Sequence, residues 1–367
     1  MQYLHAKDYH QEVKRLLNER IRGYPEHLKE VIDLLRKWHY NQQRFFIKTS
    51  GSTGKPKSIR IEREDIARSA QATAKYFGIQ EGDTALLALS PTTIGGFMMV
   101  MRAMVNEWNL YVASPASNPL EEIQSAVSLS FAAFVPMQMA KILEKNDQKE
   151  LYLLNQMKAI ILGGAPVNRH LHEKIKNLAV PVYHTYGMTE SISHIAAKRL
   201  NADNGNETET FSIIPGNSVT TDEKGRLIIT QLHEKIKHLV TNDIVEIVNK
   251  NEFRYLGRYD NMINSGGVKV LPEKVEKQLQ EAWKESVSNE VPEFLVFGKE
   301  DSTLGERVTS LVEGKHPGEE FIQKFNNQLK KQLHPYEIPK ELIFECQFKY
   351  TPNEKLDRKG TIMENAF

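Results

Sequence analysis

Short apolar runs alternate with helix-like segments through the middle of the sequence, and this alternation most strongly limits the possible fold. Apolar runs at residues 84–89, 132–135 and 159–162 have the length of buried strands, and a segment of helical pattern follows each of them. Further strands are predicted at 111–113 and 180–184, and helices at 63–76, 97–105, 120–127, 137–144 and 169–177. Because strand–helix alternation builds a largely parallel sheet covered by helices, the predicted class is α/β.

The length of the chain indicates two domains, since its 367 residues exceed what one compact core usually organises. We expect a large α/β domain at residues 1–258 and a small α+β domain at 259–367. The small domain is predicted to contain strands at 268–271, 294–297, 308–313 and 342–344 and helices at 272–284 and 318–333. Elsewhere, residues 9–40 have the pattern of one helix, 201–210 that of a surface loop, and 225–230 and 246–256 that of antiparallel strands.

Charge and cysteine content exclude several classes of protein. The sequence has 48 Lys and Arg against 47 Asp and Glu, a formal charge of +1, so it lacks the basic excess of a nucleic-acid-binding protein. The single cysteine, Cys346, excludes an internal disulfide, fits a reducing cytoplasm, and is expected to be a small buried side chain. There is no apolar run of about 18 residues and no signal-peptide pattern. We therefore expect a cytoplasmic protein without nucleic-acid or membrane partners, which leaves a homodimer open.

A loop rich in glycines, hydroxyls and lysines separates two short strand candidates at 45–47 and 58–61. Its backbone N–H groups, hydroxyls and lysines suit the anionic oxygens of a polyphosphate. The predicted phosphate-binding residues are Thr49, Ser50, Gly51, Ser52, Thr53, Gly54 and Lys55. The loop is not a Walker A motif, because only two residues separate its glycines and Pro56 follows the lysine. Taken alone, it could equally be a mobile surface hairpin.

Four further stretches carry groups suited to a nucleotide. Small residues at 163–165 follow a buried strand and would let a flat ring lie against the backbone, although tight turns there are common. Tyr186 offers an aromatic face, and Glu190 offers an oxygen ligand for Mg²⁺ near bound phosphates, or this stretch is a helix N-terminal turn with ordinary acidic bias. Asp243 at a strand end would accept ribose hydroxyls, or it is an ordinary turn residue. Lys355 lies in a charged stretch near the C-terminus, and such stretches are usually only solvated.

Taken together and in order, these stretches resemble the adenylate-forming superfamily of acyl-CoA synthetases, adenylation domains and luciferases. The resemblance is carried by residues 49–57, 186–190 and 257–260 and runs from about Phe45 to the C-terminus. Two positions depart from the family pattern: Asn242 and Glu354 stand where glycine is usual. The family normally has a longer portion before the phosphate loop, so the resemblance implies a shortened ATP- and acid-binding domain followed by a mobile C-terminal lid.

The resemblance implies a role for each matching residue. Thr189 would join the loop in binding ATP phosphates, and Glu190 would bind Mg²⁺. Adenine and ribose would contact Gly163, Gly164, Ala165, Tyr186, Asp243 and Arg258. Lys355 would be the catalytic residue, Asp260 the hinge, and Gly266, Gly267 and Lys269 would serve the thioester step with CoA. The acyl pocket would lie near Thr92, Gly95, His184, Thr185, Gly187 and Ser191.

Within the superfamily, residues 256–270 and 184–191 look similar to short bacterial o-succinylbenzoate–CoA ligases of menaquinone biosynthesis. The implied reaction joins a carboxylate to ATP, giving an acyl-adenylate, which CoA then converts to a thioester. A second carboxylate in the acid would need a polar partner, for which His184 and His194 are candidates. The alternatives are another aryl- or acyl-CoA ligase, transfer to a carrier protein, and a nucleotide-binding pseudoenzyme.

Overall fold

The computed structural model describes residues 3–5, 11, 14–15, 23–48, 57–201, 209–231, 237–286, 291–351 and 356–366. The chain forms two compact units by its internal contacts. The first contains Met1–Val219, Ile229–Leu239 and Val248–Phe253, and the second contains Thr220–Ile228, Val240–Ile247 and Arg254–Phe367.

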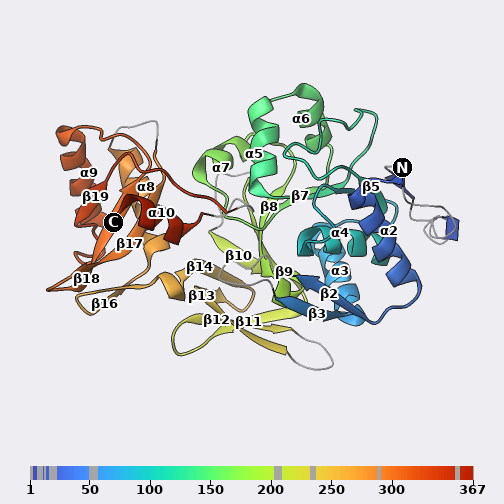
Figure 1. Cartoon of the computed structure of the whole chain (residues 1–367), viewed down its shortest axis with the longest axis horizontal. Coiled ribbons are helices and arrows are strands. Elements are labelled where there is room, and N and C mark those ends of the chain that lie inside the picture. Colours follow the sequence, from blue (N-terminus) through green and yellow to red (C-terminus); the bar gives the residue numbers. More distant parts are fainter. Residues whose placement is uncertain are drawn as a thin grey trace. The chain divides into compact units, whose positions relative to one another are not determined.

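The first unit is built on a mostly parallel sheet (Figure 1). The hydrogen-bonded order is β1-β5-β4-β6-β7-β8-β9-β10. Their bounds are β1 Tyr3–Leu4, β4 Thr84–Leu87, β5 Asn109–Val112, β6 Phe131–Phe134, β7 Ala159–Leu162, β8 Val182–Met188, β9 Ser193–Arg199 and β10 Thr210–Ile213. Strands β5, β4, β6, β7 and β8 are parallel, while β1, β9 and β10 pair antiparallel with their neighbours. The predicted parallel sheet is confirmed.

Helices cover both faces of this sheet, because neighbouring buried residues of one strand belong to two different core clusters. Leu87 packs in one cluster with α2 (Glu26–His39), α3 (Arg63–Phe77) and α4 (Ile94–Val105). Its neighbour Leu86 packs in another with α5 (Pro136–Lys145), α6 (Gln148–Asn155) and α7 (Arg169–Ile175). Successive strand residues point to opposite faces, so a strand whose every residue is buried must lie between two layers of helices. The α/β class is therefore confirmed.

The two strand candidates around the phosphate-type loop form a hairpin. β2 (Arg44–Lys48) and β3 (Ser58–Glu62) pair antiparallel along their whole length. Phe45 and Ile61 point into the core of the first unit, and Phe46 stays exposed. The predicted phosphate ligands at 49–55 lie outside the described residues.

Two sequence predictions about helices were wrong. Residues 9–40 do not form one helix, because Pro25 adopts an extended conformation and α2 begins only at Glu26. A proline restricts the residue before it to extended conformations, which ends any preceding helix. Residues 120–127 form turns, although Leu120 and Ile123 are buried. The Asn118 side chain accepts a hydrogen bond from the Leu120 amide at 3.1 Å, which favours a turn over a helix.

Four antiparallel strands have residues in both units. They are β11 Asn217–Thr221, β12 Arg226–Gln231, β13 Lys237–Asn249 and β14 Glu252–Arg258. Their order is β14-β13-β12-β11. The hairpin pattern predicted at 225–230 and 246–256 is confirmed.

The second unit has a small sheet covered by helices. Its strands are β15 Ile263–Ser265, β16 Val268–Val270, β17 Phe294–Asp301, β18 Gly305–Val312 and β19 Glu341–Ile343, and its helices are α8 Pro272–Glu285, α9 Glu319–Gln332 and α10 Arg358–Asn365. Phe294 and Val296 of β17 pack in a cluster with α8 and α9. Leu295 packs in a second cluster with α10 and with Cys346, which is buried as predicted.

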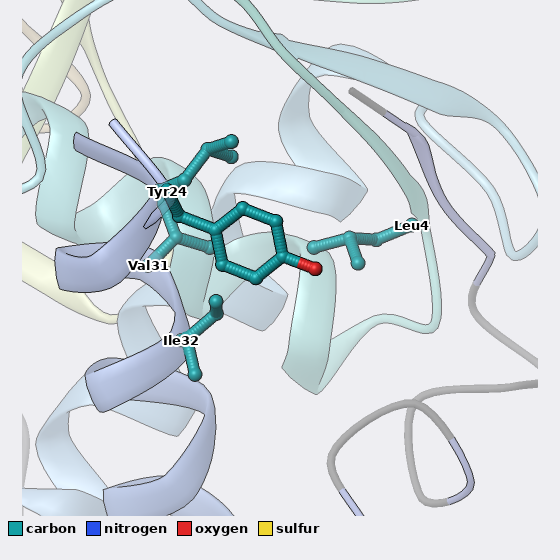
Figure 2. A pocket seen from close by; sticks show the side chains of 5 residues that line it. Leu4, Tyr24, Val31 and Ile32 are labelled. Carbon is teal, nitrogen blue, oxygen red and sulfur yellow. The ribbon is translucent and has the colours of Figure 1, made fainter. Parts of the chain in front are cut away.

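A small apolar pocket lies beside β1 and α2 in the first unit. Figure 2 shows the Tyr24 ring among the side chains of Leu4, Val31 and Ile32. Aliphatic side chains dominate this pocket, so it has the character of an incompletely filled core. Across the described residues, the structure has no helix with the length and apolar content needed to cross a membrane.

Candidate active site

The predicted adenine-binding stretch and the tyrosine motif lie side by side at the carboxyl ends of β7 and β8. Leu162 pairs with His184 in the parallel register. The Thr185 hydroxyl donates to the Leu162 carbonyl at 2.9 Å. A Cβ built at Gly163 would lie 2.9 Å from Thr185 Oγ1, so a glycine lets these two strand ends approach. Ligands of open α/β sheets bind at such carboxyl ends.

Tyr186 is held in place by two other aromatic rings. Its ring centroid lies 5.8 Å from that of Phe211 and 5.3 Å from that of Phe253, both in edge-to-face geometry. Phe211 and Phe253 stack on each other at 5.6 Å. Edge-to-face contacts of this kind are favourable and limit ring rotation. The half-buried Tyr186 therefore presents a rigid aromatic surface beside the small residues at 163–165.

His184 lies next to Ala165 and is neutral at ordinary pH. Burial is the main cause that lowers its pKa to about 4, and the nearby charge of Lys198 lowers it further, while a hydrogen bond with the Ala165 backbone opposes them. Its ring also contacts that of Phe211 at 5.6 Å. A neutral imidazole offers one donor and one acceptor, so His184 is a polar group at this site without a formal charge.

A β-bulge explains the glycine in the tyrosine motif. The register between β8 and β9 shifts between Tyr186 and Gly187. A Cβ at Gly187 would lie 2.1 Å from the Ser193 carbonyl oxygen, a distance that no side chain can occupy. Sequence reasoning placed Gly187 in an acyl pocket; the structure gives it an additional role in the close approach of two backbones.

The turn after the motif carries Thr189 and Glu190 in a 3₁₀ helix, Thr189–Ser191, where both side chains are half-buried. The buried Ser191 hydroxyl accepts from the Met188 amide at 3.0 Å and lies 2.8 Å from the Ser193 carbonyl. Its polar atom is therefore engaged with the backbone of this turn. Its predicted contact with the acid stays a prediction.

A buried arginine that sequence reasoning missed supports the same turn. Arg102 on α4 is 1% exposed, and its Nη2 donates to Ser193 Oγ at 2.9 Å and approaches His194 Nδ1 at 3.4 Å. His194 Nε2 lies 3.0 Å from Thr73 Oγ1, which itself donates to the Ser69 carbonyl. The imidazole must therefore accept at Nδ1 and donate from Nε2. An arginine within an apolar helical run was the only available signal, and it is a weak one.

Burial is the main cause of the pKa shifts of Arg102 and His194. It lowers the pKa of Arg102 to about 9. It also lowers the pKa of His194 well below its ordinary value, an effect reinforced by the charge of Arg102. His194 is therefore neutral. It also borders a cavity of about 50 Å³, whose other polar lining residues are Asp65, Arg68, Ser69, Asn217 and Gln231.

The remaining predicted acyl-pocket residues lie at the end of β4. Thr92 Oγ1 lies 2.8 Å from Ser90 Oγ, and a Cβ at Gly95 would lie 2.9 Å from a Leu89 methyl group. Thr93 caps α4 by accepting from the Gly96 amide at 3.3 Å. Thr92 and Gly95 thus lie at the same edge of the sheet as 163–165, and in the described residues Thr92 bonds to Ser90 rather than to a residue of β8.

The predicted ribose and hinge residues form a second cluster, within the second unit. Arg258 Nη1 lies 3.2 Å from Asp243 Oδ1, and its Nη2 lies 2.9 Å from Asp260 Oδ2. The Asn242 amide donates to the same Asp260 oxygen at 3.2 Å, and Thr241 Oγ1 accepts from the Asp243 amide at 3.1 Å. Burial alone would lower the pKa of Arg258, but the two carboxylates raise it above its ordinary value.

Two predicted residues of the thioester step, Gly266 and Gly267, form the tight turn between β15 and β16. Gly266 and Gly267 have φ values of +58° and +83°, which favour glycine. A Cβ at Gly266 would lie 2.6 Å from the Tyr336 ring. Lys355 lies outside the described residues. No group of three or more His, Cys, Asp or Glu side chains able to hold a metal occurs among the described residues.

The sequence and the fold of this chain are similar to those of known proteins. The family model described as "AMP-binding enzyme" matches residues 26–224. A 2-succinylbenzoate–CoA ligase from Geobacillus sp. (strain WCH70) is 26% identical over 357 residues, covering 90% of this chain and 70% of the relative. The solved acyl-CoA synthetase (AMP-forming)/AMP-acid ligase II-like protein from Dyadobacter fermentans DSM 18053 is 32% identical, with a TM-score of 0.65 and 99% of both chains covered.

A second solved structure is an O-succinylbenzoate Coenzyme A Synthetase from Bacillus subtilis, in complex with ATP and magnesium ion. It has a TM-score of 0.65 and is 20% identical, with 86% of this chain and 68% of that one covered. At this identity the likeness shows the fold alone. The fold and the relatives together define an AMP-forming acyl-CoA synthetase. The chain belongs to the AMP-binding enzyme family.

Proposed function

We propose that this chain is an ATP-dependent acid–CoA ligase whose acid is o-succinylbenzoate. A carboxylate oxygen attacks the α-phosphorus of ATP and pyrophosphate leaves; the CoA thiol then attacks the acyl carbon and AMP leaves. The observation that carries the proposal is the junction of β7 and β8. There the small residues at 163–165 follow the strand next to the one that carries Tyr186, in a chain of this family.

Adenine would lie between Gly163, Gly164 and Ala165 on one side and Tyr186 on the other. Gly164 has a φ of +88° and is exposed, so its backbone is open to a planar ligand. Asp243 would accept the ribose hydroxyls, and Arg258 would support it. Their ion pair keeps the buried Asp243 carboxylate satisfied when no nucleotide is bound.

Phosphates and Mg²⁺ would be bound by the loop at 49–55, Thr189 and Glu190. Mg²⁺ at nucleotide sites commonly takes one or two protein carboxylates and completes its shell with phosphate oxygens and water. A single carboxylate such as Glu190 therefore fits this ion without a preformed protein cage. Lys355 would place its charge on the α-phosphate and the acid carboxylate, where negative charge develops.

The choice of o-succinylbenzoate rests on the relatives. Curated relatives named 2-succinylbenzoate–CoA ligase cover 85–90% of this chain. We propose that the acid lies near Thr92, Gly95, His184 and Thr185. His184 is neutral and bonded to the Ala165 backbone, so it would supply a polar contact without the charge needed to neutralise a second carboxylate.

CoA would act in the second step at Gly266, Gly267 and Lys269, after the segment beyond Asp260 has rotated. Gly267 has a φ of +83° and is exposed, and nothing lies within 4 Å of the position of a Cβ there, so its backbone is open to a ligand. Domain movement between the two steps would shield the reactive adenylate from water.

The test is AMP release that depends on both ATP and CoA, measured across o-succinylbenzoate, benzoate, coumarate, acetate and a medium-chain fatty acid. Activity confined to o-succinylbenzoate is the expected result. Activity on a different acid would retain the ligase and replace the substrate. ATP binding without AMP release on any of the acids would favour the pseudoenzyme and contradict the proposal.

A further inference from the structure

A half-buried ion pair ties α10 to α8 in the second unit and has no place in the roles proposed so far. Arg358 Nη2 lies 2.7 Å from Glu276 Oε1 and donates to the Val296 carbonyl at 2.6 Å. Glu276 Oε1 also accepts from the Val296 amide at 2.7 Å. The two side chains are 20% and 15% exposed. One carboxylate therefore fixes the start of α10 to both α8 and β17.

This pair stands beside the predicted catalytic lysine in the sequence. Arg358 is the first residue of α10 and follows Lys355 by three positions. Residues 352–355 lie outside the described part, but both flanks are described and joined. Tyr350 and Leu356 form an antiparallel bridge, and the Asp357 amide donates to the Lys349 carbonyl at 2.8 Å.

The same helix α8 also contacts the predicted hinge. Glu273 lies one turn before Glu276, so both carboxylates share a face of the helix. Glu273 accepts a hydrogen bond from the side chain of Asn261, the residue after Asp260. A Cβ at Gly257 would lie 2.5 Å from Glu273 Oε2, so the backbone before the hinge lies against the same carboxylate. The first two turns of α8 thus hold the hinge segment through Glu273 and α10 through Glu276.

We propose that Glu276 and Arg358 are positioning residues for adenylation, which hold the backbone flanking Lys355 at a fixed place relative to the hinge. This proposal rests on the proposed function. A lysine is a point charge on a flexible stem, so the accuracy of its placement depends on the backbone that carries it. Displacements of about 1 Å at a reacting group can cost about a hundred-fold in rate.

The experiment separates the two half-reactions in the full-length protein. Adenylation is followed by acid-dependent ATP–pyrophosphate exchange, and thioester formation by CoA-dependent AMP release from supplied acyl-adenylate. The variants are Glu276→Gln, Arg358→Gln and the milder Arg358→Lys. Arg307→Gln is the matched control, because it breaks a 2.8 Å pair with Glu341 in the same unit, and neither residue belongs to α8 or α10.

We expect Glu276→Gln and Arg358→Gln to lower kcat of adenylation by roughly ten-fold or more while the KM for ATP and the thioester step change less than about two-fold. Arg358→Lys should retain part of the lost rate, because it keeps the charge but not the planar guanidinium, whose Nη2 donates to both Glu276 and the Val296 carbonyl. Amide exchange at Asp357 and Gly360 should accelerate in these variants and not in Arg307→Gln.

Three results would overturn the inference: an equal loss in both half-reactions, the same split in Arg307→Gln, or wild-type rates in both steps with unchanged amide exchange. If Arg358→Gln does not fold, the same criteria are applied to Arg358→Lys. Failure of the proposed function is distinguishable, because the wild-type protein would then show no acid-dependent exchange, and the inference would fall with it.

Discussion

Replacing Gly163 with alanine should damage the fold of the adenine site through one identified contact. The new Cβ would lie 2.9 Å from Thr185 Oγ1, closer than carbon–oxygen contacts normally come. Gly163 does not have a left-handed backbone conformation, so alanine itself would not strain the chain there. The clash must therefore be relieved by the Thr185 side chain, which is β-branched and has few alternative rotamers.

The magnitude follows from what Thr185 gives up. Its hydroxyl donates to the Leu162 carbonyl at 2.9 Å, and Leu162 is buried. A rotated Thr185 would lose this bond to a buried carbonyl, at a cost of about 1 kcal/mol. Thr185→Ala loses the same bond but removes the obstructing oxygen, so adding Gly163→Ala to it should cost little or stabilise by about 0.4–1 kcal/mol.

The assay is urea unfolding of Gly163→Ala, Thr185→Ala and the double variant in a Trp283→Phe background. The chain has three tryptophans, and removing Trp283 leaves fluorescence from the first unit, including the fully buried Trp108. We expect the two single losses not to add, with a coupling of at least about 1 kcal/mol. Losses that add to within about 0.5 kcal/mol would refute the reasoning, because independent sites behave in that way.

Three other changes test the remaining roles. Lys355→Ala should abolish ATP–pyrophosphate exchange and spare thioester formation from supplied acyl-adenylate, whereas equal loss of both activities would remove the assignment. Asp243→Asn removes the ion pair with Arg258 at 3.2 Å and should raise the KM for ATP roughly ten-fold, as expected for the loss of one charged hydrogen bond. The control is Asp222→Asn, which removes another ion pair of the second unit and should leave the KM for ATP unchanged. His184 has a pKa of about 4 in the folded protein, below its value of about 6.5 in the unfolded chain. Between these two pH values the unfolded state binds more protons than the folded state. The free energy of unfolding should therefore fall as the pH drops from about 6.5 to about 4. Thermal unfolding of His184→Gln should show a weaker dependence on pH there, and an identical dependence would contradict the burial of this histidine.

The order and spacing of motifs were readable from the sequence because they depend on local chemistry. The strand at 159–162 is an uninterrupted apolar run and was predicted with its exact bounds, β7 Ala159–Leu162. The glycines after it and the tyrosine motif at 186–190 were placed at one site, and the structure brings 163–165 and Tyr186 to adjacent strand ends. Parallel β–α alternation makes this juxtaposition predictable, since carboxyl ends of parallel strands share one edge.

The contacts that support this site were not readable, because they join residues far apart in the sequence. Arg102 donates a hydrogen bond to Ser193 and approaches His194, both about ninety residues away in the sequence. The sequence of the apolar helix does not predict which residues this arginine contacts. Gly187 is required by the Ser193 carbonyl across a β-bulge, and β9 itself was not predicted. Long-range packing decides these features, whereas local propensity gives only a weak signal for them.

The asparagine that departs from the family pattern is informative about whether the site has decayed. Asn242 adds a side chain where glycine is usual, and an added side chain could have blocked the neighbouring Asp243. The amide of Asn242 instead donates to Asp260, the same carboxylate that accepts from Arg258. Asp243 remains buried and paired with Arg258. Asn242 therefore adds a hydrogen bond between the predicted ribose-binding strand and the predicted hinge. It leaves Asp243 and Arg258 paired, which favours an active ligase over a pseudoenzyme.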